Sequence, residues 1–550
     1  MFGGSRIIFR LSWTTLGVEN MIHTLLRFAL GTTMALACAC ASAQPVNAFP
    51  IKAYRVLGNT LLSPEAVQTA TLPHTGVQSS FETIQLALES LEKAYLDAGY
   101  GSVRVEIPEQ ELELGTVTLH VTEGALADIT IEPDAFFDAL NVRNSLPSLR
   151  MKESVNIHQL NRSLVLANEG GVKVTNVTFK RNPNHRDVDA VVKVTGENPA
   201  RWMAVVDNTG ARSTGLYRTG LIYQNANLFN RDHSLSLQAM TSPDHLSEVR
   251  ILGLAYRVPL YALGDSLDFN LSSSNVDSGQ VAQVGGGPDL AISGSGVMLG
   301  ARYTHNFEAS AELQHALSIG LEQRAYGSSV TPLGATSSLV PDLTTRPLTL
   351  SYVQNSHSPK RDLSTTLSWL KNLPGGSNGS TAHFNQLGGR SGANADFQII
   401  KVNLAYTERF ASQWMLRAGL SGQRTSDLLI AAEQFGVGGS DSVRGFGERE
   451  IAGDLGLRAG LEVWAPALSM DPWRMIPLGF IEGARVLRNQ PAAGEIPSQV
   501  ISSAGLGLRA AYGRNLSLRM DWGYVLKGVT GITGPASSDQ KLHASMAWVF

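Results

Sequence analysis

The chain has 550 residues, which is too long for one ordinary domain and predicts two to four structural units. Only 17% of the residues are charged and the net charge is -3, so the composition gives no indication of a nucleic-acid-binding surface. Glycine is abundant at 54 residues and mean hydropathy is -0.02, which favours a chain of alternating polar and apolar residues over one compact apolar core.

Residues 1–43 predict a secretory signal peptide, in which residues 1–20 are an N-terminal extension or a misplaced start. From Met21 a positively charged start and an apolar run lead to the small-residue exit Ala41-Ser42-Ala43. A lipoprotein signal ending at Cys38 is the alternative, although alanine stands where such signals carry leucine. The only other cysteine, Cys40, also lies in this segment, so the exported chain has none.

Residues 48–124 and 125–199 predict two small α/β domains, each in the order strand, helix, strand, strand. In the first, residues 81–100 place four apolar side chains at helical spacing before Gly99 ends the helix: Ile84, Leu88, Leu91 and Tyr95. Val117, Leu119 and Val121 then alternate with polar neighbours as a half-buried strand does. The second domain repeats this order with a strand at 127–133, a helix at 155–169 and strands at 174–181 and 187–196.

The first of these domains resembles a POTRA domain of the two-partner secretion type. Eight positions carry the resemblance: Tyr95, Gly99, Tyr100, Pro108, Gln110, Gly115, Glu123 and Gly124. A generic small adaptor domain is the alternative interpretation of the strand and helix order alone.

After residue 200 the hydrophobic period becomes two. HSLSLQAM puts Leu235, Leu237 and Ala239 on one face and polar side chains on the other, and SLDFNLSS, QWMLRAGLSG, DLGLRAGLEVW and NLSLRMDWGYV behave in the same way. Sixteen such segments fit between residues 201 and 550, about 22 residues each with their connections. No apolar run of 18 residues occurs after the signal segment, so a membrane would have to be crossed by strands.

The predicted fold class is therefore mainly β: a transmembrane barrel of about 16 antiparallel strands over residues 200–550, preceded by two α/β domains. A soluble β-sandwich or propeller is the alternative, because its strands also alternate. The final segment, KLHASMAWVF, ends on Phe550, which resembles the signal read by the outer-membrane assembly machinery. The aromatic residues expected to lie at the membrane boundaries are Trp464, Trp522, Tyr524 and Trp548.

The longest loop near the end of the chain, residues 425–453, carries the run SVRGFGE between the eleventh and twelfth predicted strands. Glycines around Val443, Arg444, Gly445 and Phe446 allow a tight fold, so the loop can turn back into the barrel. A guanidinium inside the wall needs an acidic partner, and Glu482 follows soon after on a predicted strand. The alternatives are a solvated loop arginine and an unpaired lumen-facing carboxylate.

Together the α/β tandem, the barrel and the VRGF run resemble the hemolysin secretion and activation protein family of outer-membrane transporters. In that family the VRGF loop meets an aspartate in a Phe-x-Asp-x-Gly run, whereas this sequence has Phe480-Ile481-Glu482-Gly483-Ala484. The resemblance implies export of one large hemolysin- or adhesin-like exoprotein from the periplasm to the cell surface of a Gram-negative bacterium. It implies periplasmic POTRA domains, insertion by the assembly machinery, contact with lipid and lipopolysaccharide, and a monomer.

Two other functions stay open at this stage: an assembly factor of the same superfamily and a passive porin. An enzyme is not expected, since HExxH does not occur and His543 and Ser545 fit lumen-facing positions. No cofactor, metal site or nucleic-acid partner is expected. Outer-membrane secretion is the function that the sequence favours.

Overall fold

The computed structural model describes residues 49–111, 115–181, 187–211, 214–246, 249–276, 279–281, 290–292, 295–308, 310, 312–327, 342–386, 390–531 and 534–550. The predicted signal peptide lies outside these residues. The chain divides into two compact units. The smaller one holds the described residues up to Leu57 with Ser63–Leu91 and Glu106–His120, and the larger one holds Gly58–Leu62, Glu92–Val105 and Val121–Phe550.

The first α/β region has a buried helix face against a small sheet. Its elements are β1 (Phe49–Ile51), β2 (Ala53–Leu57), α1 (Pro64–Thr71), η1 (Leu72–His74), β3 (Gly76–Ser79), α2 (Phe81–Asp97), β4 (Val103–Glu106) and β5 (Thr116–Glu123). Ile84, Leu91 and Tyr95 of α2 are buried as predicted, while Ala87 is buried in place of the half-buried Leu88. The sequence analysis missed α1, an eight-residue helix that depends on the Ser63 cap more than on apolar spacing.

The second α/β region comprises β6 (Leu126–Glu132), α3 (Ala139–Ser145), α4 (Ile157–Asn168), β7 (Lys173–Arg181) and β8 (Val188–Gly196). Its sheet has the order β6-β8-β7, and Val142 of α3 and Leu160 of α4 lie in its buried apolar cluster. The long helix and the three strands match the prediction. The seven-residue helix α3 was not predicted, since it is capped by Asp138 and too short to show a period.

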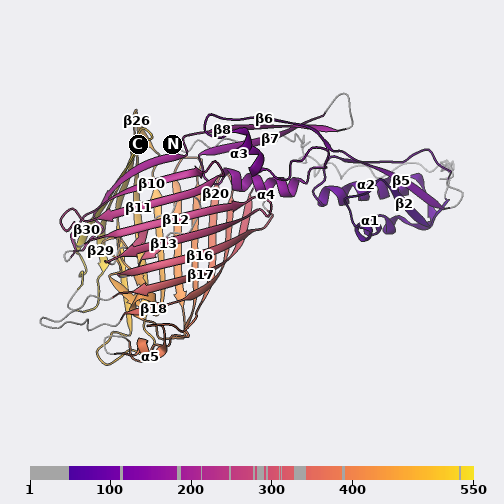
Figure 1. The fold of residues 1–550 in the computed structure, drawn as a ribbon. Helices are drawn as coiled ribbons and strands as arrows, with labels where there is room; N and C mark the ends of the chain where they lie inside the picture. The colour runs from indigo at the N-terminus through magenta and orange to yellow at the C-terminus, as the bar shows by residue number, and fades with distance from the viewer. Residues whose placement is uncertain are drawn as a thin grey trace, which may run out of the picture. The chain divides into compact units, whose positions relative to one another are not determined.

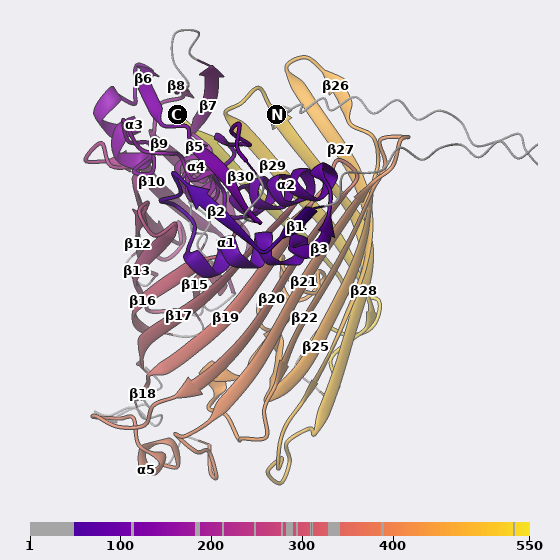
Figure 2. The same ribbon diagram turned by 90° about the vertical axis from the view of Figure 1, so that its right-hand side faces the viewer.

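Sixteen strands of the described chain close into an antiparallel barrel (Figures 1 and 2). They are β9 (Ala200–Asp207), β10 (Arg218–Leu228), β11 (His233–Thr241), β12 (Ile251–Leu260), β13 (Asp265–Ser274), β16 (Gly296–Asn306), β17 (Leu313–Tyr326), β19 (Pro347–His357), β20 (Arg361–Asn372), β21 (Gln398–Arg409), β22 (Met415–Arg424), β25 (Leu455–Trp464), β27 (Trp473–Leu487), β28 (Ser498–Tyr512), β29 (Leu516–Lys527) and β30 (Gln540–Val549). The predicted barrel and its strand number are confirmed.

Four short strands accompany the barrel. The segments β18 (Leu343–Thr345) and β26 (Leu468–Met470) extend its sheet, and β14 (Gly279–Val281) pairs with β15 (Leu290–Ile292). The seam between β30 and β9 has five residue pairs in register, against fifteen between β27 and β28. Asn208 extends this seam, because its side chain donates to Leu542 O at 2.7 Å and accepts from Ala544 N at 2.9 Å.

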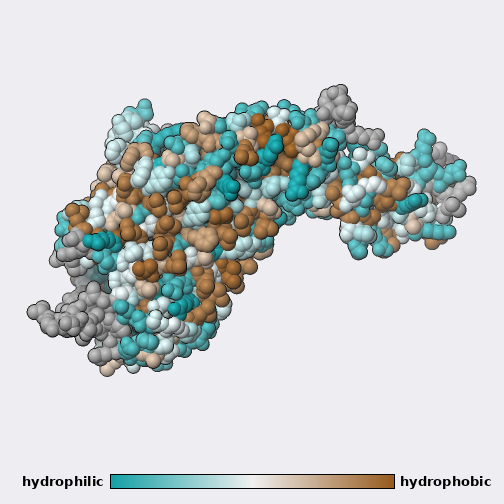
Figure 3. Space-filling model, viewed as in Figure 1, coloured by the Kyte–Doolittle hydropathy of each residue, from teal (hydrophilic) through white to brown (hydrophobic). Residues whose placement is uncertain are grey.

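The barrel is apolar outside and polar inside. On β11, Leu237 is 39% exposed on the outer face, whereas Ser236 and Gln238 are buried toward the lumen. Hydrophobic side chains cover much of the outer surface of the strands in the view of Figure 3. Such a surface suits a lipid bilayer, because apolar side chains that contact acyl chains are not exposed to water. Among the described residues, no helix has the length and apolar character needed to cross a bilayer.

The second α/β region and the barrel belong to one compact unit and meet in a buried polar junction. Lys173 of β7 lies 2.6 Å from Asp232, in the turn between β10 and β11, and its side chain is only 2% exposed. Asp232 also accepts from Tyr261 Oη at 2.7 Å and from Asn141 Nδ2 at 2.9 Å. Burial lowers the pKa of Lys173, and the neighbouring Asp232 carboxylate opposes that shift.

We expect Lys173→Met to weaken this junction by about 3–5 kcal/mol, because it leaves the Asp232 carboxylate buried without its cation. Limited proteolysis of the detergent-solubilised protein measures the effect as faster cleavage between the second α/β region and the barrel. Lys180→Met is the matched control, since Lys180 lies on the same strand and is exposed. Equal cleavage rates for the two variants would show that the ion pair does not hold the junction.

Candidate functional site

The long loop between β22 and β25 folds into the barrel as a hairpin. It contains a short helical turn, η2 (Ala431–Glu433), and two short strands, β23 (Phe435–Val437) and β24 (Ile451–Gly453), which pair antiparallel. Val443 and Phe446 are fully buried and pack with inward-facing side chains of β27, β28 and β29. The apolar residues of the VRGF run thus fix the hairpin tip against one side of the inner wall.

Arg444 is 1% exposed and contacts three carboxylates from three different strands. Its guanidinium donates to Glu482 of β27 at 2.7 and 3.1 Å, to Glu462 of β25 at 2.7 Å and to Asp521 of β29 at 3.2 Å. Its backbone N–H also donates to Glu482 at 2.9 Å, and its guanidinium lies 3.5 Å from the Phe480 ring centroid. The sequence analysis named Glu482 alone among these partners.

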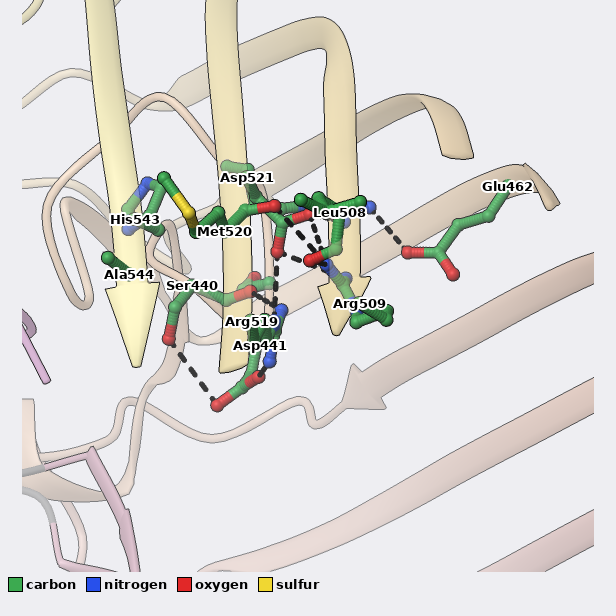
Figure 4. A network of polar contacts seen from close by, with 12 residues as sticks. Ser440, Asp441, Glu462, Leu508, Arg509, Arg519, Met520, Asp521, His543 and Ala544 are labelled. Carbon is green, nitrogen blue, oxygen red and sulfur yellow. Dashed lines mark hydrogen bonds and ion pairs between the residues drawn. The ribbon is translucent and has the colours of Figure 1, made fainter. Parts of the chain in front are cut away.

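The same wall carries arginines of its own that also pair with these carboxylates (Figure 4). Arg458 lies 3.0 Å from Glu482, and both Arg509 and Arg519 lie 2.8 Å from Asp521. Arg519 also pairs with Asp441 of the loop. The site is therefore a network of alternating charges in which Arg444 is the cation that the hairpin supplies.

Two glycines allow the loop backbone to touch the wall. Gly445 has φ +98°, a conformation that favours glycine, and its N–H donates to His543 Nε2 of β30 at 3.0 Å. Gly523 of β29 faces this turn so closely that a Cβ there would lie 2.5 Å from Gly445 N and 2.8 Å from the Arg444 carbonyl carbon. A side chain at position 523 and the docked hairpin therefore exclude each other.

Two further acidic residues, Glu433 within the loop and Asp454 at its end, anchor the loop through partners other than those of Arg444. Glu433 is 3% exposed and accepts from Arg324 of β17 at 2.8 Å, from Tyr326 at 2.9 Å and from Thr345 at 2.9 Å. The fully buried Asp454 pairs with Arg390 and accepts from the backbone N–H of Asn489 at 2.7 Å. Glu433 binds β17, the seventh strand of the barrel, whereas Arg444 binds β25, β27 and β29, which are among the last five. The hairpin is therefore attached to two different parts of the barrel wall.

The eight POTRA-type positions stabilise turns of the first α/β region and do not form one cluster. The Tyr95 hydroxyl donates to Asn59 and lies 3.4 Å from Glu123, whose carboxylate accepts from Thr60 N at 2.7 Å. The Gln110 side chain bonds both backbone groups of Thr118, at 2.6 and 2.8 Å, and reaches Pro108 O at 3.3 Å.

The remaining POTRA-type positions are backbone features. Gly99 and Gly115 have φ +94° and +73°, and Gly99 O accepts from Ile157 N at 2.9 Å. Tyr100 N donates to Tyr95 O at 2.8 Å, and a Cβ on Gly124 would lie 2.7 Å from Ser102 O. At the other end of the chain, Phe550 is 57% exposed and exchanges backbone hydrogen bonds with Trp202 at 3.0 and 3.2 Å.

Sequence reasoning missed Glu462, Asp521, His543 and Gly523 as parts of the Arg444 site. The first three occupy inward positions of strands that the sequence predicts, next to outward residues such as Leu461, Trp522 and Leu542. A search for charged residues on the inward face of each alternating segment would have found them. Gly523 gave no such signal, since a close backbone approach depends on tertiary structure. Within the described residues, no group of three or more metal-ligating side chains was found.

An outer-membrane-type barrel with α/β domains before it and an arginine-bearing hairpin inside it defines a transporter class. The model for haemolysin secretion/activation protein ShlB/FhaC/HecB matches residues 188–510, more than half of the chain. The model for the ShlB-type POTRA domain matches residues 49–124. The chain therefore belongs to the haemolysin secretion/activation protein family.

Two curated proteins are similar to the chain. Hemolysin transporter protein HpmB of Proteus mirabilis is 24% identical over 425 residues, which cover 74% of this chain and 71% of that protein. Outer membrane transporter CdiB-2 of Burkholderia pseudomallei strain 1026b is 22% identical over 204 residues, which cover 37% of this chain and 32% of that protein. The protein is an outer-membrane transporter of two-partner secretion, its POTRA region is periplasmic, and it acts with a secreted exoprotein.

Two solved structures share the fold. CdiB from Escherichia coli aligns with a TM-score of 0.70 and 16% identity, covering 94% of this chain and 93% of that one. CdiB from Acinetobacter baumannii aligns with a TM-score of 0.66 and 16% identity, covering 92% of this chain and 90% of that one. Because the POTRA region of this family is periplasmic, the end of the barrel that carries the second α/β region is periplasmic and the opposite end is extracellular.

Proposed function

We propose that this transporter exports one large exoprotein through the barrel, and that the Arg444 network sets the position of the hairpin during transport. The observation that carries the proposal is the burial of Arg444 among carboxylates of three strands, in the lumen through which a client would pass. A buried cation with three acidic partners holds a loop far more firmly than a solvated one.

The domain limits and other partners belong to the same proposal. Residues 48–124 and 125–199 act as two POTRA domains that receive the unfolded client, and residues 200–550 form the pore. An exposed sheet edge in these domains can take up an extended client segment as an additional strand. Phe550 acts as the signal for insertion by the outer-membrane assembly machinery. The protein works as a monomer, without a cofactor or a catalytic activity of its own.

Deletion of the gene is expected to remove one large exoprotein from the culture supernatant and leave other outer-membrane barrels at their normal abundance. Mass spectrometry of supernatants and outer membranes from parent and deletion strains measures both quantities. A general fall in outer-membrane barrels would favour an assembly factor instead. An unchanged supernatant, under conditions in which a candidate client is synthesised, would contradict dedicated secretion.

A further inference from the structure

Two arginines lie on the lipid-facing side of the barrel at its extracellular end. Arg424 ends β22 and Arg485 lies near the end of β27, and both are exposed. Arg424 is directly opposite Ile400 of β21, and Arg485 is directly opposite Leu457 of β25. These two partners are 50% and 51% exposed on the outer face. Because opposite residues in a sheet share a face, both arginines point out of the barrel.

The position of β25 gives the level of these arginines in the membrane. This strand has ten residues, the length that a tilted strand needs to cross the hydrocarbon core. Its outward side chains include Leu457, Leu461 and Val463. Trp464, which was expected at the membrane boundary, instead faces the lumen and donates to Glu462 at 2.8 Å. Gln423 pairs with Gly456, so Arg424 is level with the first residue of β25. The arginines therefore lie where lipid headgroups of the outer leaflet meet the barrel.

The two arginines lie on neighbouring parts of the outer face, and no acidic partner is found for either among the described residues. They are two strands apart and differ by two residues along the strands, so their backbones are separated by roughly 12 Å. Within the described chain neither has an ion-pair partner, and Arg485 donates to the Ser498 hydroxyl at 3.1 Å. Lys371, on the same face of β20, differs because it lies 2.8 Å from Asp396.

We propose that Arg424 and Arg485 bind the phosphate groups of a lipopolysaccharide molecule in the outer leaflet. A guanidinium matches phosphate oxygens in a bidentate geometry, and two of them at this separation suit one headgroup with more than one phosphate. The exposed Leu457 and Ile481 lie between and below them and provide the surface for acyl chains. The site would anchor the transporter in the outer leaflet, and its function does not depend on the client.

The test measures lipopolysaccharide retained by the purified full-length protein in detergent. Wild type and the double variant Arg424→Gln/Arg485→Gln are saturated with phosphorylated lipopolysaccharide and washed, and the bound lipid is quantified by mass spectrometry. Arg361→Gln is the matched control, because Arg361 is exposed on the outer face at the periplasmic end of β20, where it pairs with Glu408. Heat-dependent migration in gel electrophoresis verifies that each barrel is folded.

We expect the double variant to retain at least fivefold less lipid than wild type, and Arg361→Gln to retain the wild-type amount. Wild type should retain dephosphorylated lipopolysaccharide only at the level of the double variant. Equal retention by wild type and the double variant would overturn the proposal, as would equal retention of the two lipids. Full competition by millimolar inorganic phosphate would overturn it too, since the site would then bind a free anion.

Discussion

Arg444→Ala is expected to reduce export of the client at least tenfold while the barrel stays at its normal abundance in the outer membrane. The substitution removes the loop cation that contacts Glu462, Glu482 and Asp521. Removing one partner of a buried ion cluster costs about 3–5 kcal/mol. We expect the substitution to destabilise the docked position of the hairpin more than the barrel itself. The reason is that wall arginines still pair with Glu482 and Asp521.

Supernatant mass spectrometry, with immunoblots of the outer membrane, measures this result. Arg444→Lys should also export poorly, since a point charge cannot replace a guanidinium that reaches three strands. Arg474→Ala is the matched control, as Arg474 is exposed on the same strand as Glu482 and has no ion-pair partner in the described part of the chain. Wild-type export by Arg444→Ala would mean that the buried ion network does not serve transport.

Gly523→Ala is expected to prevent docking of the hairpin without changing any charge. The added Cβ would lie 2.5 Å from Gly445 N, a distance that real Cβ atoms essentially never show. The nearest neighbours are backbone atoms of Arg444 and Gly445, so no flexible side chain can move to relieve the overlap. We expect export to fall to the level of Arg444→Ala, and the ion conductance of the barrel in planar bilayers to change because the hairpin has moved.

Gly419→Ala separates this steric effect from a general intolerance of alanine in the barrel. Gly419 also lies on the inward side of a strand, but a Cβ there meets only an Arg458 nitrogen at 3.6 Å, an ordinary contact. Its export and conductance should match wild type. If Gly523→Ala exported normally, the close approach of loop and wall would have no part in transport.

The sequence predicted the barrel well because its signal is local. Alternation in segments such as HSLSLQAM follows directly from strand geometry, and the eleventh and twelfth strands fell where β22 and β25 lie. The short helices α1 and α3 were missed because their stability depends on a capping side chain and on packing. No periodicity can reveal such a helix.

The candidate site could be predicted only in part, for a related reason. Arg444 and Glu482 were named because each is unusual in its own stretch of sequence. Asp521 and His543 are ordinary inward residues, and only closure of the sheet brings β29 and β30 beside the hairpin. The second anchor at Glu433 depends on Arg324, which is 109 positions away in the sequence.

The pairing of charges within the wall has a consequence for whatever passes through the pore. Three carboxylates of the wall face four wall arginines: Arg417 lies 4.0 Å from Glu462, Arg458 lies 3.0 Å from Glu482, and Arg509 and Arg519 each lie 2.8 Å from Asp521. When the hairpin leaves, it removes Arg444 together with Asp441, so this part of the wall keeps a small excess of positive charge. We therefore expect a long polypeptide whose own charge varies along its length to meet no strong electrostatic trap at this level, because most of the wall charge is paired. We expect neither acidic nor basic segments of the client to be held strongly here.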